Sequence, residues 1–583
     1  MSDQVTPSPG KRRIGVYVCH CGGNISDYVD VDRVVDAVKD EAGVVVTRDA
    51  MFTCSDVTQE EIAKDIREQG LDGLVVASCS PKLHTTTFRG VARRGGLNPY
   101  QYTQANIREQ CSWAHTDDRE GATGKAISLV RAAIARTRLS EALEPLVVET
   151  TRRALVVGGG VAGMRAAIGL ADMGLGVFLV EREAELGGWV GGLPKMFPNG
   201  TDGHELARRL QDEIRRRPAI NVFTRAEVLE KTGTYGNYQV TVRAGGEQIR
   251  LDVGQVIVAT GFASYEPEPG ELGYGAPGVI TLADFTRMFD RAGGPLLYHG
   301  RPVKTIAYIY CVGSRNEKHP YCSRYCCSAA VHASLLVAAR DPGARQYHLY
   351  RDMRTYGRHE LEYIESRRRG SVYMKFADDD APRVSADGGS LRVTVRDLLT
   401  GGNELAIGAD LVVLVTGMVP RDNEELTTTL KLPVGLDGFY NEIHPKLRPV
   451  ETVVDSVSIC GACQGPKTVA ESVASGLAAA AQAAAVLKRG VAELDPQVAF
   501  VHPEACTGCG QCVEACPYSA ISLVEHGSLV EHGPAKVASI DAAACKGCGG
   551  CVPSCPEDAI DLAGYTDAQI RSMIDSLLVG SEA

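Results

Sequence analysis

The chain has 583 residues, 44% of them hydrophobic and 23% charged, the composition of an ordinary globular protein with several domains. Its formal net charge of −11 disfavours a general nucleic-acid role, and no run of about 18 apolar residues indicates a membrane span. Residues 1–12 lack the apolar segment of a secretion signal, so we expect a short disordered lead and a cytoplasmic location. Nineteen cysteines, an odd number at short spacings, favour metal ligands or redox groups over disulfides.

Residues 13–150 are predicted to form a small parallel α/β domain that ends in a connecting helix. Three short strands each lead into a cysteine-bearing loop, and helical stretches such as QEEIAKDIREQG separate them. Because the carboxyl ends of parallel strands meet at one edge of a sheet, these loops are expected to converge. They are candidates to hold an iron–sulfur cluster, and the alternative is a redox or docking surface with free thiols. The cysteines concerned are Cys19, Cys21, Cys54, Cys79 and Cys111.

The segment RALVVGGGVAGMRAAIGLADMGLGVFLVE, residues 153–181, carries a dinucleotide fingerprint. A buried strand leads into Gly158-x-Gly160-x-x-Gly163, then a helix and a second strand that ends at Glu181. Such glycines tighten the turn and let the backbone approach a pyrophosphate at the helix N-terminus, while the acid can bind a ribose hydroxyl. The pattern predicts an FAD-binding α/β domain over residues 151–496.

Later segments are predicted to return to the same cofactor. Gly187-Gly188 is a pair often seen in flavoproteins, Ala259-Thr260-Gly261 ends a strand, and Thr416-Gly417 repeats that logic. A strand-rich excursion precedes each of the last two motifs, at about 220–253 and at about 371–409. This repeat indicates two dinucleotide-type halves, as in thioredoxin reductase and its relatives. The predicted cofactor-binding residues are Gly158, Gly160, Val161, Ala162, Gly163, Glu181, Arg182, Gly187, Gly188, Ala259, Thr260, Gly261, Thr416, Gly417, Gly461, Pro466, Lys467 and Thr468.

The second half departs from this plan at its first strand, TIAYIYCVGSRNE. A second glycine-rich loop for a nicotinamide nucleotide is missing, and four cysteines within seventeen residues stand in its place: Cys311, Cys322, Cys326 and Cys327. Four thiolates at this spacing predict a [4Fe–4S] cluster in an inserted loop, residues 311–327. Buried structural thiols and a zinc site are the alternatives.

The segment SICGACQGPKTVAESVASGLAAAAQAAAVL closes the flavin domain. A helix of small residues is expected to point its N-terminus at the cofactor, with Lys467 at that end. A cation there would stabilise reduced, anionic flavin, which makes Lys467 the candidate catalytic residue. Cys460 and Cys463 form a C-x-x-C that is able to form a redox disulfide, although the position usual for that disulfide, after the first GG pair, contains no cysteine.

Residues 497–565 contain the motif C-x2-C-x2-C-x3-C-P twice, and a tail, 566–583, follows. In this pattern three thiolates wrap one iron–sulfur cube, and the fourth cysteine reaches the other cube. A pair of zinc sites is the alternative, but zinc needs neither the fourth cysteine, nor the proline, nor the duplication. We assign one [4Fe–4S] cluster to Cys506, Cys509, Cys512 and Cys555, and a second to Cys545, Cys548, Cys551 and Cys516. This region resembles an α+β bacterial two-cluster ferredoxin.

Taken together, the segments VYVCHCGGNI, MFTCSD, ASCSPKLH, NIREQCSWAH, CVGSRN…YCSRYCC and CQGPK resemble the A-type subunits of heterodisulfide reductase. The resemblance covers about residues 13–565. It implies FAD in a thioredoxin-reductase-like domain, several [4Fe–4S] clusters, and a dimer of assemblies with B- and C-type subunits. It also implies electron bifurcation between ferredoxin and a disulfide, fed by a hydrogenase or formate dehydrogenase branch.

The sequence departs from longer members of that family, which carry a further ferredoxin module inside the flavin domain. The stretch from Glu185 to Pro302 contains no cysteine, which puts the same bifurcating circuit in doubt. We therefore predict an electron-transfer subunit that converts between paired and single electrons. The alternatives are a stand-alone pyridine-nucleotide disulfide reductase with a fused ferredoxin, and a non-catalytic redox sensor.

Overall fold

The computed structural model describes residues 12–290, 294–387, 390–525 and 536–579 and forms two compact units. One unit combines the chain up to Val148 with the chain from Glu493 onward, and the other runs from Glu149 to Ala492. Of the predicted disordered lead, residues 1–11 lie outside the described residues. Arg12 does not fit that prediction, because it is buried and donates hydrogen bonds to the carbonyls of Asp72 and Arg138.

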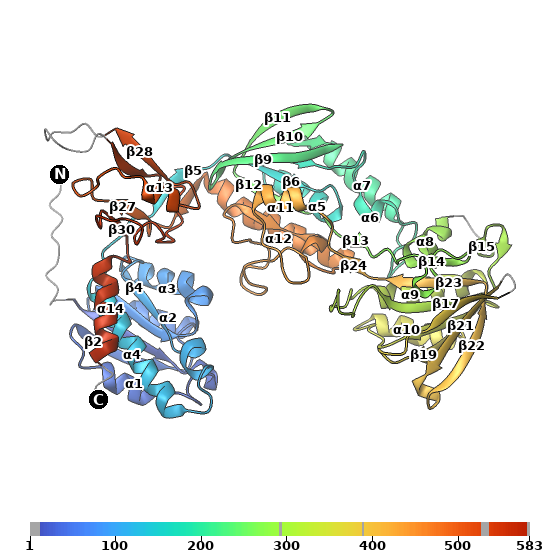
Figure 1. Cartoon of the computed structure of the whole chain (residues 1–583), viewed down its shortest axis with the longest axis horizontal. Helices are drawn as coiled ribbons and strands as arrows, with labels where there is room; N and C mark the ends of the chain where they lie inside the picture. The colour runs from blue at the N-terminus through green and yellow to red at the C-terminus, as the bar shows by residue number, and fades with distance from the viewer. Residues whose placement is uncertain (1–11, 291–293, 388–389, 526–535, 580–583) are drawn as a thin grey trace. The chain divides into compact units, whose positions relative to one another are not determined.

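The N-terminal domain is a parallel sheet covered by helices (Figure 1). Its strand order is β2-β1-β3-β4, one strand more than predicted, with β1 at Ile14–Cys19, β2 at Val44–Ala50, β3 at Gly73–Ser78 and β4 at Tyr102–Asn106. The helices are α1 (Val31–Val38), α2 (Asp56–Glu68), α3 (Pro81–Gly95) and α4 (Arg119–Arg138). Strands β1 and β3 are buried along their whole length, so the apolar residues of the sequence form the centre of this domain.

The cysteine-rich tail folds as two antiparallel strand pairs. β27 (Ala499–Val501) pairs with β30 (Ile560–Leu562), β28 (Ile521–Glu525) pairs with β29 (Lys536–Ile540), and α13 (Gln511–Ala515) lies between the pairs in sequence. The last residues form α14 (Asp567–Val579), which packs against α4 of the N-terminal domain. Two short strands, β5 (Leu146–Glu149) and β26 (Val491–Leu494), lie where the chain passes between the units.

Arg136 of α4 joins the N-terminal domain to the tail. Its guanidinium lies 4.0 Å from the centre of the Tyr565 ring and donates hydrogen bonds to the Gly564 carbonyl (2.7 Å) and to Thr103 Oγ1 (3.1 Å). The residue is only 7% exposed, so these contacts are largely shielded from water.

Replacing Arg136 by alanine is expected to weaken the docking of the tail by about 3 kcal/mol, because a shielded cation–π contact and charged hydrogen bonds are lost together. Hydrogen–deuterium exchange should show the amide protection of α14 falling by about 100-fold. The exposed Arg119→Ala variant at the start of α4 serves as the control. Unchanged protection of α14 in Arg136→Ala would mean that the arginine does not fasten the tail.

The second unit consists of two similar halves, each with a five-stranded parallel sheet and a three-stranded antiparallel excursion. In the first half the order is β25-β12-β6-β7-β8, and Val258 of the inner strand β12 lies opposite Val157 of β6 and Ile459 of β25. The elements are β6 (Arg153–Val157), α5 (Val161–Asp172), β7 (Gly176–Val180), α6 (Gly188–Gly191), α7 (Gly203–Arg215), β8 (Ile220–Phe223), β12 (Gln255–Val258), β25 (Val457–Ile459) and α12 (Val469–Arg489). The excursion is β9 (Ala226–Thr234), β10 (Asn237–Ala244) and β11 (Glu247–Val253).

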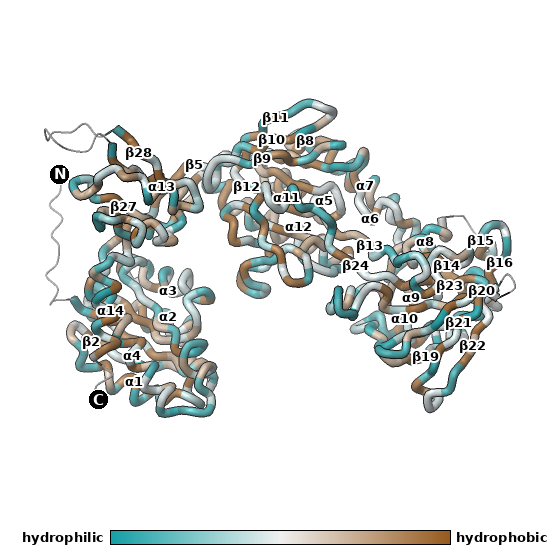
Figure 2. The backbone as a smooth tube through the Cα atoms, in the orientation of Figure 1, coloured by the Kyte–Doolittle hydropathy of each residue, from teal (hydrophilic) through white to brown (hydrophobic). Residues whose placement is uncertain are grey.

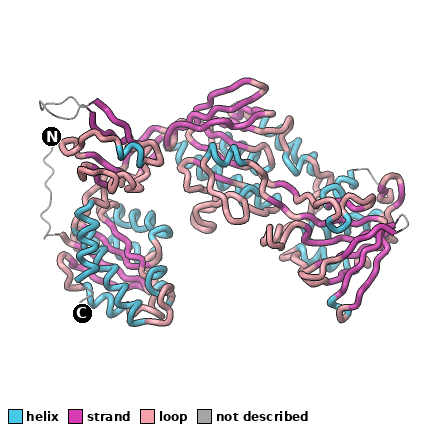
Figure 3. The backbone as a smooth tube through the Cα atoms, in the orientation of Figure 1, coloured by secondary structure: helices cyan, strands magenta, loops and turns pink. Residues whose placement is uncertain are grey.

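The second half repeats this order with β14-β23-β17-β18-β19. Its elements are β14 (Val279–Thr281), α8 (Leu282–Arg287), β17 (Thr305–Val312), α9 (Cys326–Arg340), β18 (Arg345–Tyr350), α10 (His359–Arg368), β19 (Val372–Lys375), β23 (Leu411–Thr416) and α11 (Glu424–Leu430). The excursion is β20 (Arg383–Asp387), β21 (Ser390–Asp397) and β22 (Asn403–Ala409), and the short pairs are β13 (Ala263–Ser264) with β24 (Met418–Val419) and β15 (Leu297–Tyr298) with β16 (Arg301–Pro302). Figure 3 shows both excursions as strand-rich hairpins, and hydrophobic stretches follow the sheet strands in Figure 2.

Among the described residues, α12 is the one helix that is long and apolar enough to cross a membrane. Its small residues Ala479, Ala480, Ala483 and Ala484 are buried in the core of the first half, where the helix packs against α5. The same helix therefore forms part of the core of this half.

Candidate functional site

A cavity of about 570 Å³ extends through the second unit. The glycine loop and the ends of β7 and β12 line one part of it, and residues from α8, α9 and the start of α12 line the rest. Most of the predicted cofactor-binding residues face it: Gly158, Gly160, Val161, Ala162, Glu181, Arg182, Gly187, Gly188, Ala259, Thr260, Gly261, Lys467 and Thr468.

The three glycines of the loop differ in what surrounds them. Gly158 has φ +110°, and a Cβ there would lie 2.4 Å from the Ala259 carbonyl oxygen. A Cβ on Gly163 would lie 1.9 Å from the Gly158 carbonyl oxygen, so this glycine permits close packing of α5 on the turn. A Cβ on Gly160 would meet no atom within 4 Å. Gly160 therefore borders open space in the cavity, as a pyrophosphate-binding glycine requires.

Glu181 fixes the end of β7 at the cavity. Its carboxylate accepts hydrogen bonds from the backbone N–H groups of Gly159 (2.6 Å) and Glu183 (2.9 Å), and the residue is 8% exposed. Each carboxylate oxygen keeps a further lone pair with which to accept a ribose hydroxyl.

Replacing Glu181 by glutamine should weaken FAD binding by about 10- to 100-fold, because the amide has one acceptor oxygen for two backbone donors and leaves one buried N–H unpaired. The FAD dissociation constant, followed by flavin fluorescence, measures this change. Exposed Glu185→Gln is the matched control, and equal affinities for the two variants would show that the Glu181 carboxylate does not shape the site.

Aromatic and cationic residues that the sequence analysis did not identify complete the lining. Trp189 stacks on Phe262 with ring centres 5.3 Å apart and donates from Nε1 to the Phe262 carbonyl (3.0 Å). Arg421 Nε donates to the same carbonyl (2.9 Å), and burial lowers the pKa of its guanidinium. Arg421 follows the second return strand in the sequence GMVPRDN, and that position was the signal available to find it.

Five predicted cofactor residues do not line the cavity: Gly163, Thr416, Gly417, Gly461 and Pro466. Thr416 Oγ1 lies 3.2 Å from Ser264 Oγ, and a Cβ on Gly417 would lie 2.7 Å from Ser323 Oγ of the cysteine loop. The end of β23 packs against the cysteine loop, where the Met418 N–H donates to Ser323 Oγ. Met418 lines the cavity, but Thr416 and Gly417 do not, so the cavity does not support their predicted contact with the cofactor.

Lys467, the candidate catalytic residue, lines the cavity just before α12. Its Nζ donates to Gln464 Oε1 (3.2 Å), and burial lowers its pKa. The helix start is fixed by a capping box between Thr468 and Glu471, so Lys467 projects from a rigid turn.

The nearby C-x-x-C does not form a disulfide. Cys460 and Cys463 are both buried free thiols, and Cys463 Sγ donates to the Cys460 carbonyl (3.1 Å). The structure therefore does not support the redox-disulfide interpretation of this pair.

The cysteine loop follows β17 and leads into α9. Cys311 has φ +62°, and Cys326 and Cys327 form the first turn of α9, at the place where the first half has its glycine loop and α5. A hydrogen bond with Cys327 raises the pKa of Cys326, and burial and the neighbouring Cys311 and Cys322 raise it further. The four predicted thiols therefore gather at one place, and Tyr325, next to Cys326 in sequence, lines the large cavity.

A buried donor near these thiols has no partner. Arg315 bonds through Nη2 to Asp352 Oδ2 (2.8 Å), while its Nη1 is buried and makes no hydrogen bond. An unsatisfied N–H beside four thiols fits a group that carries acceptor sulfides, as an iron–sulfur cluster does.

The tail thiols separate into the two predicted sets. Cys506, Cys509, Cys512 and Cys555 line one small cavity, so the last cysteine of the second motif meets the first three of the first motif. The pKa of Cys551 is raised to about 11, mainly by burial and in part by Cys545, Cys548 and Cys516, which are therefore its neighbours. Backbone N–H groups of Ala520 and Ala559 donate to Cys516 and Cys555 at 3.3 Å in both cases.

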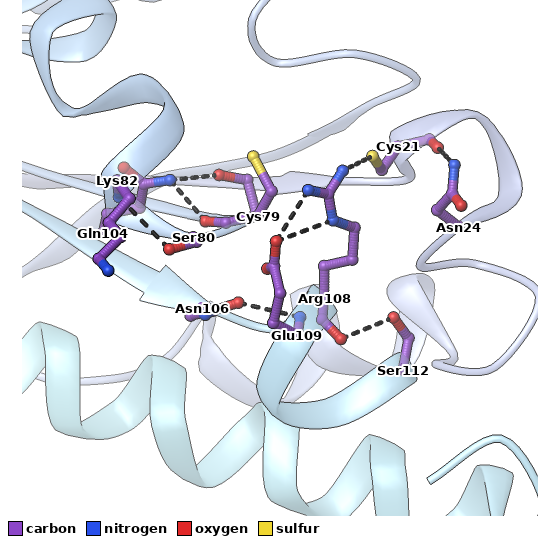
Figure 4. A network of polar contacts seen from close by, with 11 residues as sticks. Cys21, Asn24, Cys79, Ser80, Lys82, Gln104, Asn106, Arg108, Glu109 and Ser112 are labelled. Carbon is purple, nitrogen blue, oxygen red and sulfur yellow. Dashed lines mark hydrogen bonds and ion pairs between the residues drawn. The ribbon is translucent and has the colours of Figure 1, made fainter. Parts of the chain in front are cut away.

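At the carboxyl edge of the N-terminal sheet, four of the five predicted cysteines are neighbours: Cys19, Cys21, Cys54 and Cys79. The pKa of Cys79 is raised to about 11, mainly by burial and in part by Cys21 and Cys19, which also raise the pKa of Cys54. Arg108 donates to Cys21 Sγ (3.3 Å) and pairs with Glu109 (2.8 Å), as Figure 4 shows.

Cys111 differs from the other four. It is completely buried in the apolar core, to which Cys19 also belongs, and burial raises its pKa to about 11 without a contribution from another thiol. The interactions of the other four with one another favour those four as a cluster site, and the role of Cys111 as a ligand stays a prediction.

No three or more His, Cys, Asp or Glu side chains within residues 12–290, 294–387, 390–525 and 536–579 are arranged to hold a single metal ion. The thiols of Cys506, Cys509, Cys512 and Cys555 line a small cavity instead of meeting at one point. An iron–sulfur cube is larger than a single ion and needs thiols that are spaced around a cavity in this way.

Two protein families and several relatives match this chain. The pyridine nucleotide-disulphide oxidoreductase family matches residues 152–302, and the 4Fe-4S dicluster domain matches residues 505–559. The chain is 39% identical to the second iron–sulfur A-subunit of CoB–CoM heterodisulfide reductase from Methanopyrus kandleri, over 89% of this chain and 92% of that protein. It is 35% identical to the corresponding A-subunit of Methanocaldococcus jannaschii, over 97% and 98% of the two chains.

The chain belongs to the A-subunit family of heterodisulfide reductase. This finding confirms the resemblance recognised in the sequence, and it identifies the protein as an oxidoreductase with flavin-type and iron–sulfur domains that serves as an electron-transfer subunit.

The α/β fold class predicted for this member of the heterodisulfide reductase A-subunit family is confirmed by the two family matches. Two solved thioredoxin reductases also match the chain. The T. acidophilum enzyme is 17% identical with a TM-score of 0.40, over 57% of this chain and 99% of its own. The Lactococcus lactis enzyme is 16% identical with a TM-score of 0.41, over 58% of this chain and 100% of its own.

Proposed function

We propose that the chain is the FAD- and iron–sulfur-bearing subunit of a heterodisulfide-reductase-like complex, in which electron pairs are exchanged for single electrons. One observation carries this proposal: a single cavity is lined by the glycine loop and by Tyr325, the residue that directly precedes the cysteine pair of α9. A dinucleotide site and a thiol cluster thus adjoin each other in one unit.

When bound, FAD would supply a carrier that accepts or gives two electrons, whereas each iron–sulfur cluster carries one. The chain's own residues prepare that site. Gly160 leaves room for the pyrophosphate, and Glu181 offers acceptors for the ribose. Lys467 brings a cation to the cavity at the start of α12. Trp189 and Phe262 shield the lining from water by stacking.

We place [4Fe–4S] clusters at three thiol sets, and a fourth at the N-terminal sheet edge. One of the three is the loop of residues 311–327, and the other two are the thiol sets of the tail. The exchange of the fourth cysteine between the two motifs supports the two tail sets. The fourth would use Cys19, Cys21, Cys54 and Cys79, without Cys111.

The name of a relative supports ferredoxin as a partner, and the family resemblance supports the other partners. One, from Methanothermobacter thermautotrophicus, is named as the A-subunit of an H(2):CoB-CoM heterodisulfide,ferredoxin reductase and is 36% identical over 88% of this chain. We infer that ferredoxin is one electron carrier of this chain and that B- and C-type subunits reduce a disulfide, in a homodimeric assembly. Electron bifurcation between these two branches is part of the proposal.

The rival function is a stand-alone pyridine-nucleotide disulfide reductase. The first strand of the second half argues against it, because β17 opens into the cysteine loop and α9 begins with Cys326 instead of a glycine-rich phosphate loop.

Anaerobic rapid mixing separates the two functions. The oxidised chain is mixed either with reduced low-potential ferredoxin or with NADH or NADPH. We expect ferredoxin to bleach both the flavin and the cluster absorbance, and the nicotinamides to leave them unchanged. Rapid flavin reduction by a nicotinamide, together with consumption of a disulfide by the isolated chain, would favour the rival function.

A further inference from the structure

Arginine side chains surround the cysteine loop at residues 311–327. Arg351 donates hydrogen bonds to the carbonyls of Ser314 (2.8 Å) and Arg315 (3.0 Å), shortly after Cys311. The side chains of Arg315 and Arg351 are only 16% and 11% exposed. Each pairs with a more exposed carboxylate, Arg315 with Asp352 (2.8 Å) and Arg351 with Asp378 (3.5 Å). Water therefore screens the two carboxylates more than the two cations, and the cations keep a net effect on the loop.

Both cations lie at the segment that carries the first thiol. Arg315 follows Cys311 by four residues, and Arg351 holds the backbone at Ser314 and Arg315 through its hydrogen bonds. Together with the unpartnered Nη1 of Arg315, they offer positive charge and a free donor to a bound cluster.

The tail has the opposite charge balance. Residues 497–565 contain eight carboxylates and two lysines, whereas residues 311–327 contain three cations and one carboxylate. Glu557 lines the cavity formed by Cys506, Cys509, Cys512 and Cys555. Among the described residues of the tail, the backbone N–H groups of Ala520, Ala538 and Ala559 donate hydrogen bonds to sulfur.

Reduction adds one negative charge to a cluster, so nearby cations and donors stabilise the reduced state and raise its potential. We propose that Arg315 and Arg351 hold the loop cluster at a higher reduction potential than the two tail clusters. The loop cluster is then the higher-potential outlet of the flavin: one electron leaves the flavin, the cluster gains it, and no bond forms or breaks. This inference rests on the proposed function, because it needs a cluster in the loop.

Redox titration followed by electron paramagnetic resonance tests the inference in the full-length, cluster-loaded chain. The signal that disappears in Cys326→Ser is assigned to the loop. In the parent chain it should appear at a higher potential than the tail signals. In Arg315→Gln and Arg351→Gln it should shift to a more negative potential while the tail signals stay in place.

Two matched variants separate charge from structure. Arg315→Lys keeps the cation and should retain most of the parent potential, and exposed Arg358→Gln should change nothing. A loop signal at or below the potential of the tail, or one that does not shift in the glutamine variants, would overturn the inference alone. A parent chain with no loop signal and iron for only the tail clusters would overturn the loop cluster of the proposed function as well.

Discussion

A valine in place of Gly160 should leave the chain folded and without FAD. The Cβ position at Gly160 has no atom within 4 Å, so the valine side chain extends into the cavity and meets no protein atom at its base. It fills space that the pyrophosphate needs and keeps the phosphates from the N-terminus of α5. We expect FAD affinity to fall by at least about 100-fold, which corresponds to about 3 kcal/mol. The loss of flavin absorbance in the purified chain measures it.

The other glycines of the chain provide the comparison. Gly169→Ala on α5 makes only ordinary contacts of 3.5 Å and should keep FAD. Gly163→Ala, with its 1.9 Å approach to the Gly158 carbonyl oxygen, should destabilise the unit itself. If Gly160→Val retained FAD at parental affinity, the pyrophosphate would have to bind elsewhere, and the assignment of the cavity would be wrong.

Replacing Cys326 by serine is expected to remove one cluster and nothing else. Its thiol is buried among the other three of the loop, and serine is a poor ligand for iron. The iron content should fall by about four atoms per chain, while FAD and the tail signals remain. Iron analysis of anaerobically purified protein measures the change.

Cys463→Ser is the matched control, since Cys463 is equally buried and belongs to no predicted cluster. It should leave the iron content as in the parent. Equal iron in Cys326→Ser and the parent would mean that the thiols of residues 311–327 are structural, and the proposed route of single electrons from the flavin would be lost.

The sequence predicted well those features that local spacing determines. At Gly158 and Gly163 a side chain would collide with nearby carbonyl oxygens of the same unit, so only glycine fits. The two glycines therefore appear in the sequence as part of a recognisable motif. The exchanged tail cysteines were likewise predictable, because a short loop cannot bring its fourth cysteine back to its own cluster. The duplication of the flavin domain was visible as two strand-rich excursions, which the structure shows as separate antiparallel sheets.

Features that depend on tertiary packing were missed. The carbonyl of Phe262 accepts hydrogen bonds from both Trp189 and Arg421. These three residues come from segments far apart in sequence, so their contact depends on the folded structure. Thr416 and Gly417 resemble Thr260 and Gly261 in sequence, but β23 ends against the cysteine loop and not against the cavity.

The central claim is that one chain combines a flavin with several one-electron clusters. An anaerobic reductive titration of the native complex, with FAD and iron counted per chain, tests it most directly. The account predicts about one FAD and an uptake by this chain of about five or six electrons, two for the flavin and one for each of three or four clusters. A chain that takes up two electrons and contains no iron, or one that contains no flavin, would contradict it.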